Sequence, residues 1–311
     1  MAKRSTKDKG LIIISVILFI FFLASLVLNI KINKDLQDKK KEYESYKEEY
    51  NKNYKIYLDN EKDLSSLKSE YEKLKNLDSK TEELKKEYFE NIKKLEDDII
   101  SHKSDKKIAY LTFDDGPYYK TYKYLDILDE YDVKATFFTI GLGKERCLDN
   151  RNYNCHLLYE EEVKRGHTIA NHTFSHLIWN GLYSSSDSFI EQVKKQEQLV
   201  YENTGVKTNI VRFPGGSKTA GTKKNAIIEK LRNEGYGWVD WTAYDGDGAE
   251  LKTEEEAYKN FTSSIDENIE VVLFHDYNDI TLKILPRAIE YLKEHNYTML
   301  PLFYESNMIN K

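Results

Sequence analysis

The sequence is poor in cysteine and proline and carries no excess of positive charge. Its 311 residues include two cysteines and four prolines. Two cysteines are too few for a disulfide framework or for a structural zinc site built on cysteine thiolates. Lysine and arginine number 47 against 53 aspartates and glutamates, which gives a formal net charge of −6. A surface that neutralises nucleic-acid phosphates needs a basic excess, and we therefore expect no nucleic-acid partner.

Residues 11–30 lack charge altogether and are apolar apart from Ser15, Ser25 and Asn29. An apolar run of about 20 residues is long enough to cross the hydrocarbon core of a bilayer as a helix. A cleaved signal peptide is the alternative, but its apolar region usually spans about 7–15 residues and precedes a small-residue cleavage site. The sequence therefore predicts a transmembrane helix over residues 11–30, preceded by a basic cytoplasmic tail over residues 1–10.

Residues 31–102 contain neither glycine nor proline. Leucine or tyrosine recurs every seven residues from Leu36 to Tyr71, which is typical of a coiled-coil seam. The seam is imperfect, because Lys39, Asn53 and Asn60 occupy core positions. We expect a helical stalk over 31–102, about 100 Å long at 1.5 Å per residue. The pattern leaves open whether the stalk forms a homodimer or a solvated single helix.

From Lys106 onward, short apolar bursts alternate with amphipathic stretches of helical spacing. This alternation predicts an α/β fold with a parallel sheet or barrel of about seven strands. In such barrels the active site lies at the carboxyl ends of the strands. The bursts are KIAYLTFDD, VKATFFTIG, HTIANHTF, NIVRFPGG, WVDWTAY, IEVVLFHD and YTMLPLF. Several end in polar residues able to do chemistry, so these residues are candidates for one shared site.

Two adjacent carboxylates, Asp114 and Asp115, close the first burst. Adjacent negative charges at a strand end repel one another unless a cation compensates them. The Gly116-Pro117 pair that follows is also a turn former. The carboxylate pair alone therefore does not decide between a site and a turn.

Two histidines four residues apart, His172 and His176, lie at the end of the third burst. This is metal-ligand spacing, although a solvated histidine pair is the alternative. Together with Asp115 they would supply three protein ligands and leave one coordination position open. Zinc is the default divalent metal for such a set, and cobalt, nickel, manganese and iron remain alternatives.

Five segments in this order, TFDDGP, HTFSH, RFPGG, DWTAYDGD and LFHD, resemble the five motifs of the polysaccharide deacetylase (NodB homology) domain of carbohydrate esterase family 4. The resemblance covers residues 106–303. It implies a deformed (β/α) barrel, which agrees with the seven bursts. It also implies that Asp115, His172 and His176 hold the metal.

The resemblance assigns catalytic roles to four further residues. Asp114 would be the general base that takes a proton from water activated by the metal, and Arg212 would pair with it and keep it ionised. His275 would be the general acid that protonates the leaving nitrogen, and Asp247 would orient it and favour its protonated form.

The remaining candidates would bind the substrate. The metal and the Gly215 backbone N–H would stabilise the oxyanion. Trp241 and Leu273 would line the pocket that takes the acetyl methyl, and Pro214 is a further substrate-binding candidate. Two positions depart from the family pattern, because Gly215 replaces a frequent tyrosine and Gly248 a frequent tryptophan. Both changes remove an aromatic side chain and bear on the shape of the substrate.

The only cysteines of the chain, Cys147 and Cys155, lie between the first two motifs in an apparent insertion. Their spacing is too wide for a C-x-x-C redox motif. The sequence leaves open whether the two cysteines form a disulfide that closes a small loop or stay as two free thiols.

The resulting functional hypothesis is metal-dependent deacetylation of N-acetylated sugars in an extracellular polysaccharide, foremost N-acetylglucosamine of peptidoglycan. Basic residues flank residues 11–30 on both sides, so the charge distribution does not decide the orientation of the predicted transmembrane helix. An extracellular glycan substrate requires the C-terminal domain to lie outside. We expect a single-pass protein of the cell membrane with its catalytic domain outside. The alternatives are an O-acetyl xylan esterase, a poly-N-acetylglucosamine or chitooligosaccharide deacetylase, and an inactive glycan-binding module.

Overall fold

A computed structural model describes residues 83–141, 156–251 and 253–311, together with separate helical positions between 36 and 48. The chain forms two compact units, Met1–Tyr88 and Phe89–Lys311, and every strand described belongs to the second. The predicted tail (1–10), membrane segment (11–30), most of the predicted stalk, Cys147 and Cys155 lie outside the described residues. The coiled-coil seam and the stalk homodimer stay predictions.

Within the part of the chain that the structure describes, no helix combines the length and the apolarity needed to cross a bilayer. The predicted location, a single-pass cell-membrane protein with an extracellular catalytic domain, is contradicted by this finding.

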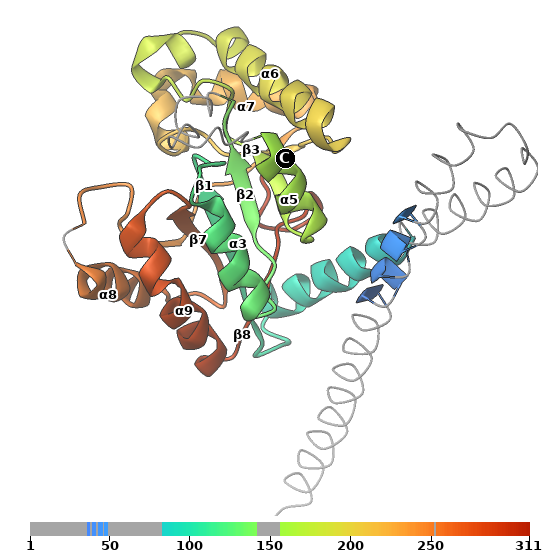
Figure 1. Cartoon of the computed structure of the whole chain (residues 1–311). Coiled ribbons are helices and arrows are strands. Elements are labelled where there is room, and N and C mark those ends of the chain that lie inside the picture. Colours follow the sequence, from blue (N-terminus) through green and yellow to red (C-terminus); the bar gives the residue numbers. More distant parts are fainter. Residues whose placement is uncertain are drawn as a thin grey trace, which may run out of the picture. The chain divides into compact units, whose positions relative to one another are not determined.

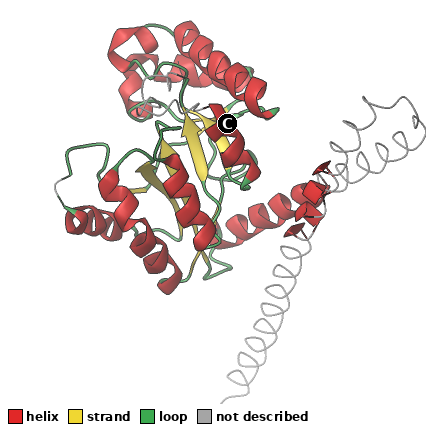
Figure 2. Cartoon of the chain, in the orientation of Figure 1, coloured by secondary structure: helices red, strands yellow, loops and turns green. Residues whose placement is uncertain are grey.

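A parallel sheet of eight strands forms the centre of the second unit, with helices packed around it (Figures 1 and 2). The order along the sheet is β5-β4-β3-β2-β1-β7-β6, and β8 pairs with the first half of β1. The strands are β1 (Lys107–Asp114), β2 (Thr136–Thr139), β3 (Thr168–Asn171), β4 (Ile210–Val211), β5 (Gly237–Trp238), β6 (Ala243–Tyr244), β7 (Ile269–His275) and β8 (Tyr297–Leu300).

The chain connection between β5 and β6 requires the sheet to curl. These strands lie at opposite ends of the strand order, yet only residues 239–242 separate them in the chain. Five residue steps reach at most about 18 Å. In a flat sheet with about 4.8 Å between strands, the first and seventh strands would lie about 29 Å apart. The predicted α/β barrel is therefore confirmed in its deformed, incompletely closed form.

The fifth apolar burst differs from the prediction, since it forms two short strands rather than one. The Arg212 side chain accounts for the break between them. Its Nε donates to the Val239 carbonyl at 3.2 Å, and its Nη2 donates to the Asp240 carbonyl at 3.3 Å. Because these two carbonyls bind the guanidinium, they do not accept from a neighbouring strand, and the segment does not continue as a strand.

Helices surround the sheet and alternate with the strands as predicted. They are α3 (Thr121–Glu130), α5 (His156–Lys164), α6 (Ser186–Thr204), α7 (Lys224–Asn233), α8 (Glu254–Ser264) and α9 (Asp279–Glu294). Side chains of Ser185, Thr253 and Asn278 accept hydrogen bonds from the first backbone N–H groups of α6, α8 and α9. These caps satisfy donors that a helix leaves free at its start.

Strand alternation separates the packing core from the site. Leu111 and Phe113 of β1 point to the helix-covered face, where Phe113 stacks on Phe137 at a centroid distance of 5.1 Å. Thr112 and Asp114 point to the opposite face and contact Arg212. Since successive side chains of a strand point to opposite faces, the same strand builds the core and supplies the site.

The helix over residues 83–100 lies within the predicted stalk, but from Phe89 onward it belongs to the second unit. Phe89 stacks on Phe303 at a centroid distance of 4.9 Å. Glu96 is completely buried and accepts hydrogen bonds from Tyr110 Oη and Ser306 Oγ, each at 2.5 Å, and from Asn307 N at 2.8 Å. The end of this helix therefore binds both β1 and the C-terminal segment.

We expect the Glu96→Ala substitution to lower the free energy of unfolding by about 2–4 kcal/mol, because it leaves three buried or half-buried donors without their acceptor. Urea denaturation of the full chain measures the change. Glu87→Ala, an exposed position on the same helix, is the matched control. Equal stability of the two variants would show that the helix end contributes nothing to the unit.

Candidate functional site

The candidate residues meet at the carboxyl ends of the strands, as the barrel rule predicts. Asp114 is the last residue of β1, and His275 is the last residue of β7. β1 and β7 pair in parallel with Asp114 opposite His275. His172 directly follows β3, and Arg212 directly follows β4. Segments far apart in the sequence thus bring base, ligand and acid candidates to one end of the barrel.

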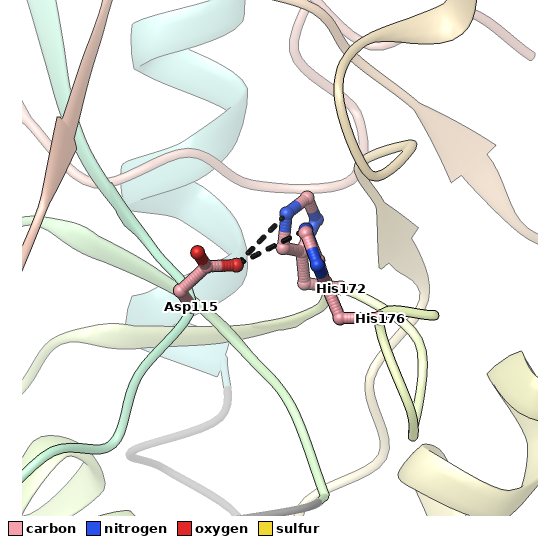
Figure 3. Close-up of side chains that lie close together, drawn as sticks. All are labelled: Asp115, His172 and His176. Carbon is pink, nitrogen blue, oxygen red and sulfur yellow. Dashed lines mark ion pairs between the residues drawn. The ribbon is translucent and has the colours of Figure 1, made fainter. Parts of the chain in front are cut away.

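The three predicted metal ligands lie together (Figure 3). Asp115 Oδ1 is 3.2 Å from His176 Nε2 and 3.6 Å from His172 Nε2. One ligand atom from each residue can be chosen so that all three lie within 4.8 Å of one another. A tetrahedral ion with ligand bonds of about 2.0–2.1 Å separates its ligand atoms by about 3.3 Å. The two distances to Asp115 match that spacing.

The chemistry of the donor set also fits a divalent cation. Asp115 Oδ1 is buried and accepts no hydrogen bond from the described residues. A buried carboxylate oxygen without a donor is costly unless a cation takes that place. His172 Nδ1 lies 2.9 Å from the Arg212 carbonyl, which can only accept, so that Nδ1 carries the proton. The unprotonated Nε2 then faces Asp115, as a metal ligand requires.

Burial keeps His172 neutral. It lowers the pKa of this imidazole well below its ordinary value, and His176 adds to the effect. A neutral imidazole offers the lone pair that binds a metal.

Three residues of the site have left-handed backbone. The φ angles of Asp115, Thr173 and His176 are +70°, +67° and +52°. Such backbone costs about 1 kcal/mol or more per residue and concentrates at functional sites.

Asp114 lies beside the ligand set in a buried ion pair. Its Oδ1 accepts from Arg212 Nη1 at 2.9 Å, and both side chains are buried. The predicted pairing is therefore present. Burial nevertheless raises the pKa of Asp114 above its ordinary value, although the Arg212 charge opposes the rise. A carboxylate with a raised pKa is a stronger base than an exposed one.

His275 is held by Asp247 through two contacts. Its Nδ1 lies 2.6 Å from Asp247 Oδ1, and its backbone N–H donates to Asp247 Oδ2 at 2.7 Å. Burial by itself lowers the pKa of His275, but the charge and hydrogen bond of Asp247 raise it to about 10. His275 is thus protonated at neutral pH and available as a proton donor.

The predicted substrate-binding residues lie around this centre. Gly215 is exposed, and its N–H makes no hydrogen bond with the described residues. Pro214 is buried and its carbonyl accepts from Tyr183 Oη at 2.7 Å. Leu273 is two residues before His275 on β7 and therefore shares its face. Trp241 packs over Gly216, whose Cβ, if present, would lie 3.0 Å from the indole.

A second layer of contacts was not predicted from the sequence. The Thr281 hydroxyl, in the first turn of α9, lies 2.7 Å from Asp245 Oδ2 and 2.9 Å from Asp247 Oδ2, and its one proton can be donated to either carboxylate. Asp276 accepts from Thr121 Oγ1 and is completely buried. The only sequence signal for Asp276 was its place next to His275. Nothing in the sequence pattern connected Thr281 with the site.

The chain is similar in sequence to known polysaccharide deacetylases. The family model for polysaccharide deacetylase matches residues 101–234. Two peptidoglycan-N-acetylglucosamine deacetylases of Bacillus cereus are 29% and 30% identical to the chain over 212 and 199 residues. These alignments cover 65% and 62% of this chain and 72% and 85% of the relatives. A bifunctional xylanase/deacetylase of Pseudobutyrivibrio xylanivorans is 29% identical over 198 residues, which are 63% of this chain but 30% of that protein.

The fold is also that of a solved relative. The catalytic domain of the peptidoglycan N-acetylglucosamine deacetylase from Eubacterium rectale is 32% identical, with a TM-score of 0.60 over 66% of this chain and 93% of that domain. Sequence similarity, the curled parallel barrel and the five ordered motifs lead to one conclusion: the chain belongs to the polysaccharide deacetylase family, the NodB homology domains of carbohydrate esterase family 4.

Proposed function

We propose that the protein hydrolyses the N-acetyl group of N-acetylglucosamine units in a polysaccharide, foremost peptidoglycan, and releases acetate. One observation carries this proposal. A paired carboxylate, a three-residue ligand set and a histidine held by a carboxylate, all facing one end of the barrel, supply a base, a metal site and an acid. Hydrolysis of an amide needs all three functions in one place.

Asp115, His172 and His176 would hold the cation, and zinc is the metal we propose for this donor set. When bound, a divalent cation lowers the pKa of water and polarises a carbonyl oxygen. Asp114 accepts the proton of the attacking water, whose oxygen bonds to the acetyl carbon. The raised pKa of Asp114 suits it for this task, and Arg212 fixes the direction of its carboxylate.

His275 completes the reaction as the acid. Because Nδ1 is bound to Asp247, the proton that can leave is the one on Nε2. It passes to the sugar nitrogen while the carbon–nitrogen bond breaks, which gives acetate and a free amine. The Gly215 N–H, which has no hydrogen-bond partner among the described residues, stabilises the oxyanion. Pro214, Trp241 and Leu273 line the site for the acetyl methyl.

Two substrate alternatives keep the same chemistry. The similarity to a bifunctional xylanase/deacetylase supports an O-acetyl xylan ester as one of them. A poly-N-acetylglucosamine or chitooligosaccharide is the other. The peptidoglycan deacetylase relatives favour the N-acetylated wall polymer. An inactive glycan-binding module is disfavoured, because base, ligands and acid are all present in the described residues.

Acetate release from purified peptidoglycan, acetylxylan and N-acetylglucosamine oligomers tests the activity and ranks the substrates. We expect release from peptidoglycan that a chelator abolishes and that added zinc restores. Asp114→Asn keeps the shape of the side chain but removes the base, and should lower kcat by a factor of about 10²–10⁴. Asp105→Asn, at an exposed position nearby in the sequence, is the control. Chelator-insensitive release, or full activity of Asp114→Asn, contradicts the mechanism.

The pH profile tests His275 and Asp247. The protonated form of His275 is the active acid, so kcat/KM should fall on the alkaline side as this group loses its proton. With a pKa raised to about 10 by Asp247, the fall is expected near pH 10, and lower if a bound cation opposes the charge. Asp247→Asn removes the stabilising charge and should move the alkaline limb down by about 1–3 pH units. An unchanged limb in Asp247→Asn would show that His275 is not the titrating acid.

A further inference from the structure

Trp179 is the most exposed large apolar side chain among the described residues. It is 90% exposed, whereas the other members of this group range from 44% to 53%. The other two tryptophans of the chain are packed. Trp238 lies edge-on against Phe213 at a centroid distance of 5.6 Å, and Trp241 packs over Gly216. A single exposed apolar side chain is common on protein surfaces, so the position of Trp179 relative to the site, and not its exposure alone, carries the argument.

The position of Trp179 connects it with the site. It lies three residues after the metal-ligand candidate His176 in the short helical segment Ile178–Leu182. The Ile178 Cδ1 lies 3.3 Å from where a Cβ on Gly215 would be. The segment therefore packs against the loop whose N–H we assign to the oxyanion. A ligand that is bound at the catalytic centre and extends past the Gly215 loop would pass the segment that carries Trp179.

Hydrogen bonds fix the segment at both ends. Ile178 N donates to the His176 carbonyl at 3.0 Å, and Asn180 N donates to the Leu177 carbonyl at 3.0 Å. At the far end, Tyr183 Oη donates to the Pro214 carbonyl at 2.7 Å. A backbone segment that is already held in place loses little conformational entropy when a ligand binds. This arrangement favours a preformed contact surface.

We propose that Trp179 stacks on a pyranose ring next to the sugar whose acetyl group is removed, and so makes the enzyme specific for polymers of at least two sugar units. This inference rests on the proposed function. In β-1,4-linked hexosamines the ring substituents are equatorial, so each ring has flat faces of axial C–H bonds. Such a face packs on an indole, whose π-electron surface carries negative charge that attracts the C–H hydrogens.

Activity on substrates of two sizes tests the proposal. With metal-loaded full-chain enzyme, kcat and KM are measured on the N-acetylglucosamine tetramer and on 4-nitrophenyl acetate, which has no sugar. Trp179→Ala should raise KM for the tetramer by about three- to tenfold, the loss expected for one stacked ring. Trp179→Phe should restore part of it. Neither variant should change the hydrolysis of the aryl ester or the bound metal content.

Tyr201→Ala is the matched control, because Tyr201 is 46% exposed on α6 and has no assigned role. An unchanged KM for the tetramer in Trp179→Ala overturns the proposal and leaves a contact with another macromolecule as the reason for the exposure. An equal loss of kcat/KM on the tetramer and on the aryl ester in Trp179→Ala also overturns the proposal, since it indicates general damage to the site.

A binding measurement separates this inference from the proposed function. Tetramer binding is compared between Asp114→Asn and the double variant Asp114→Asn/Trp179→Ala, neither of which needs turnover. Binding weakened by about three- to tenfold in the double variant supports the stacking role even if acetate is never released. Equal binding by the two variants refutes the stacking role even if wild-type enzyme is fully active.

Discussion

The buried guanidinium of Arg212 is the interaction on which the site depends. Its side chain is completely buried, and it donates to Asp114 Oδ1 at 2.9 Å and to Thr112 Oγ1 at 2.6 Å. Its side chain also donates hydrogen bonds to two backbone carbonyls of the segment that crosses from β5 to β6. The backbone carbonyl of Arg212 accepts a hydrogen bond from His172 Nδ1. A buried charge is tolerated only with such complete pairing. One residue thereby orients the proposed base Asp114, sets the tautomer of His172, a proposed metal ligand, and binds the segment at which the sheet curls.

Much of the barrel could be predicted because the pattern is local. Asp114 and His275 end β1 and β7, and His172 and Arg212 directly follow β3 and β4. Parallel strands carry their carboxyl ends to one side of the barrel. The division of the fifth burst into β5 and β6 could not be predicted, since it depends on the side chain of Arg212, the residue after β4, binding carbonyls in that segment. The burial of Glu96 was hidden for a similar reason. Its partners Tyr110 and Ser306 lie 14 and 210 residues away in the chain.

The site could be predicted where ionisable or metal-binding side chains stand at strand ends. It could not be predicted where the contact is made by a residue type that occurs throughout the fold. Aspartate and histidine at strand ends indicate metal and proton chemistry, and the structure gathers those side chains. A threonine in a helix such as Thr281 gives no such signal, yet its hydroxyl contacts Asp247, which holds His275. Trp179 lies in the apolar stretch LIWNGL, where burial would be expected, and only the folded chain shows it exposed.

The central claim is that one divalent cation is held by Asp115, His172 and His176 beside the base Asp114. Anomalous diffraction from a crystal of the zinc-loaded protein tests it most directly. The account predicts a single strong peak bonded to Asp115 Oδ1 and to the two Nε2 atoms at about 2.0–2.2 Å, with a fourth position open to solvent. A peak on other residues, or these three side chains turned away from one another in the presence of zinc, would contradict it.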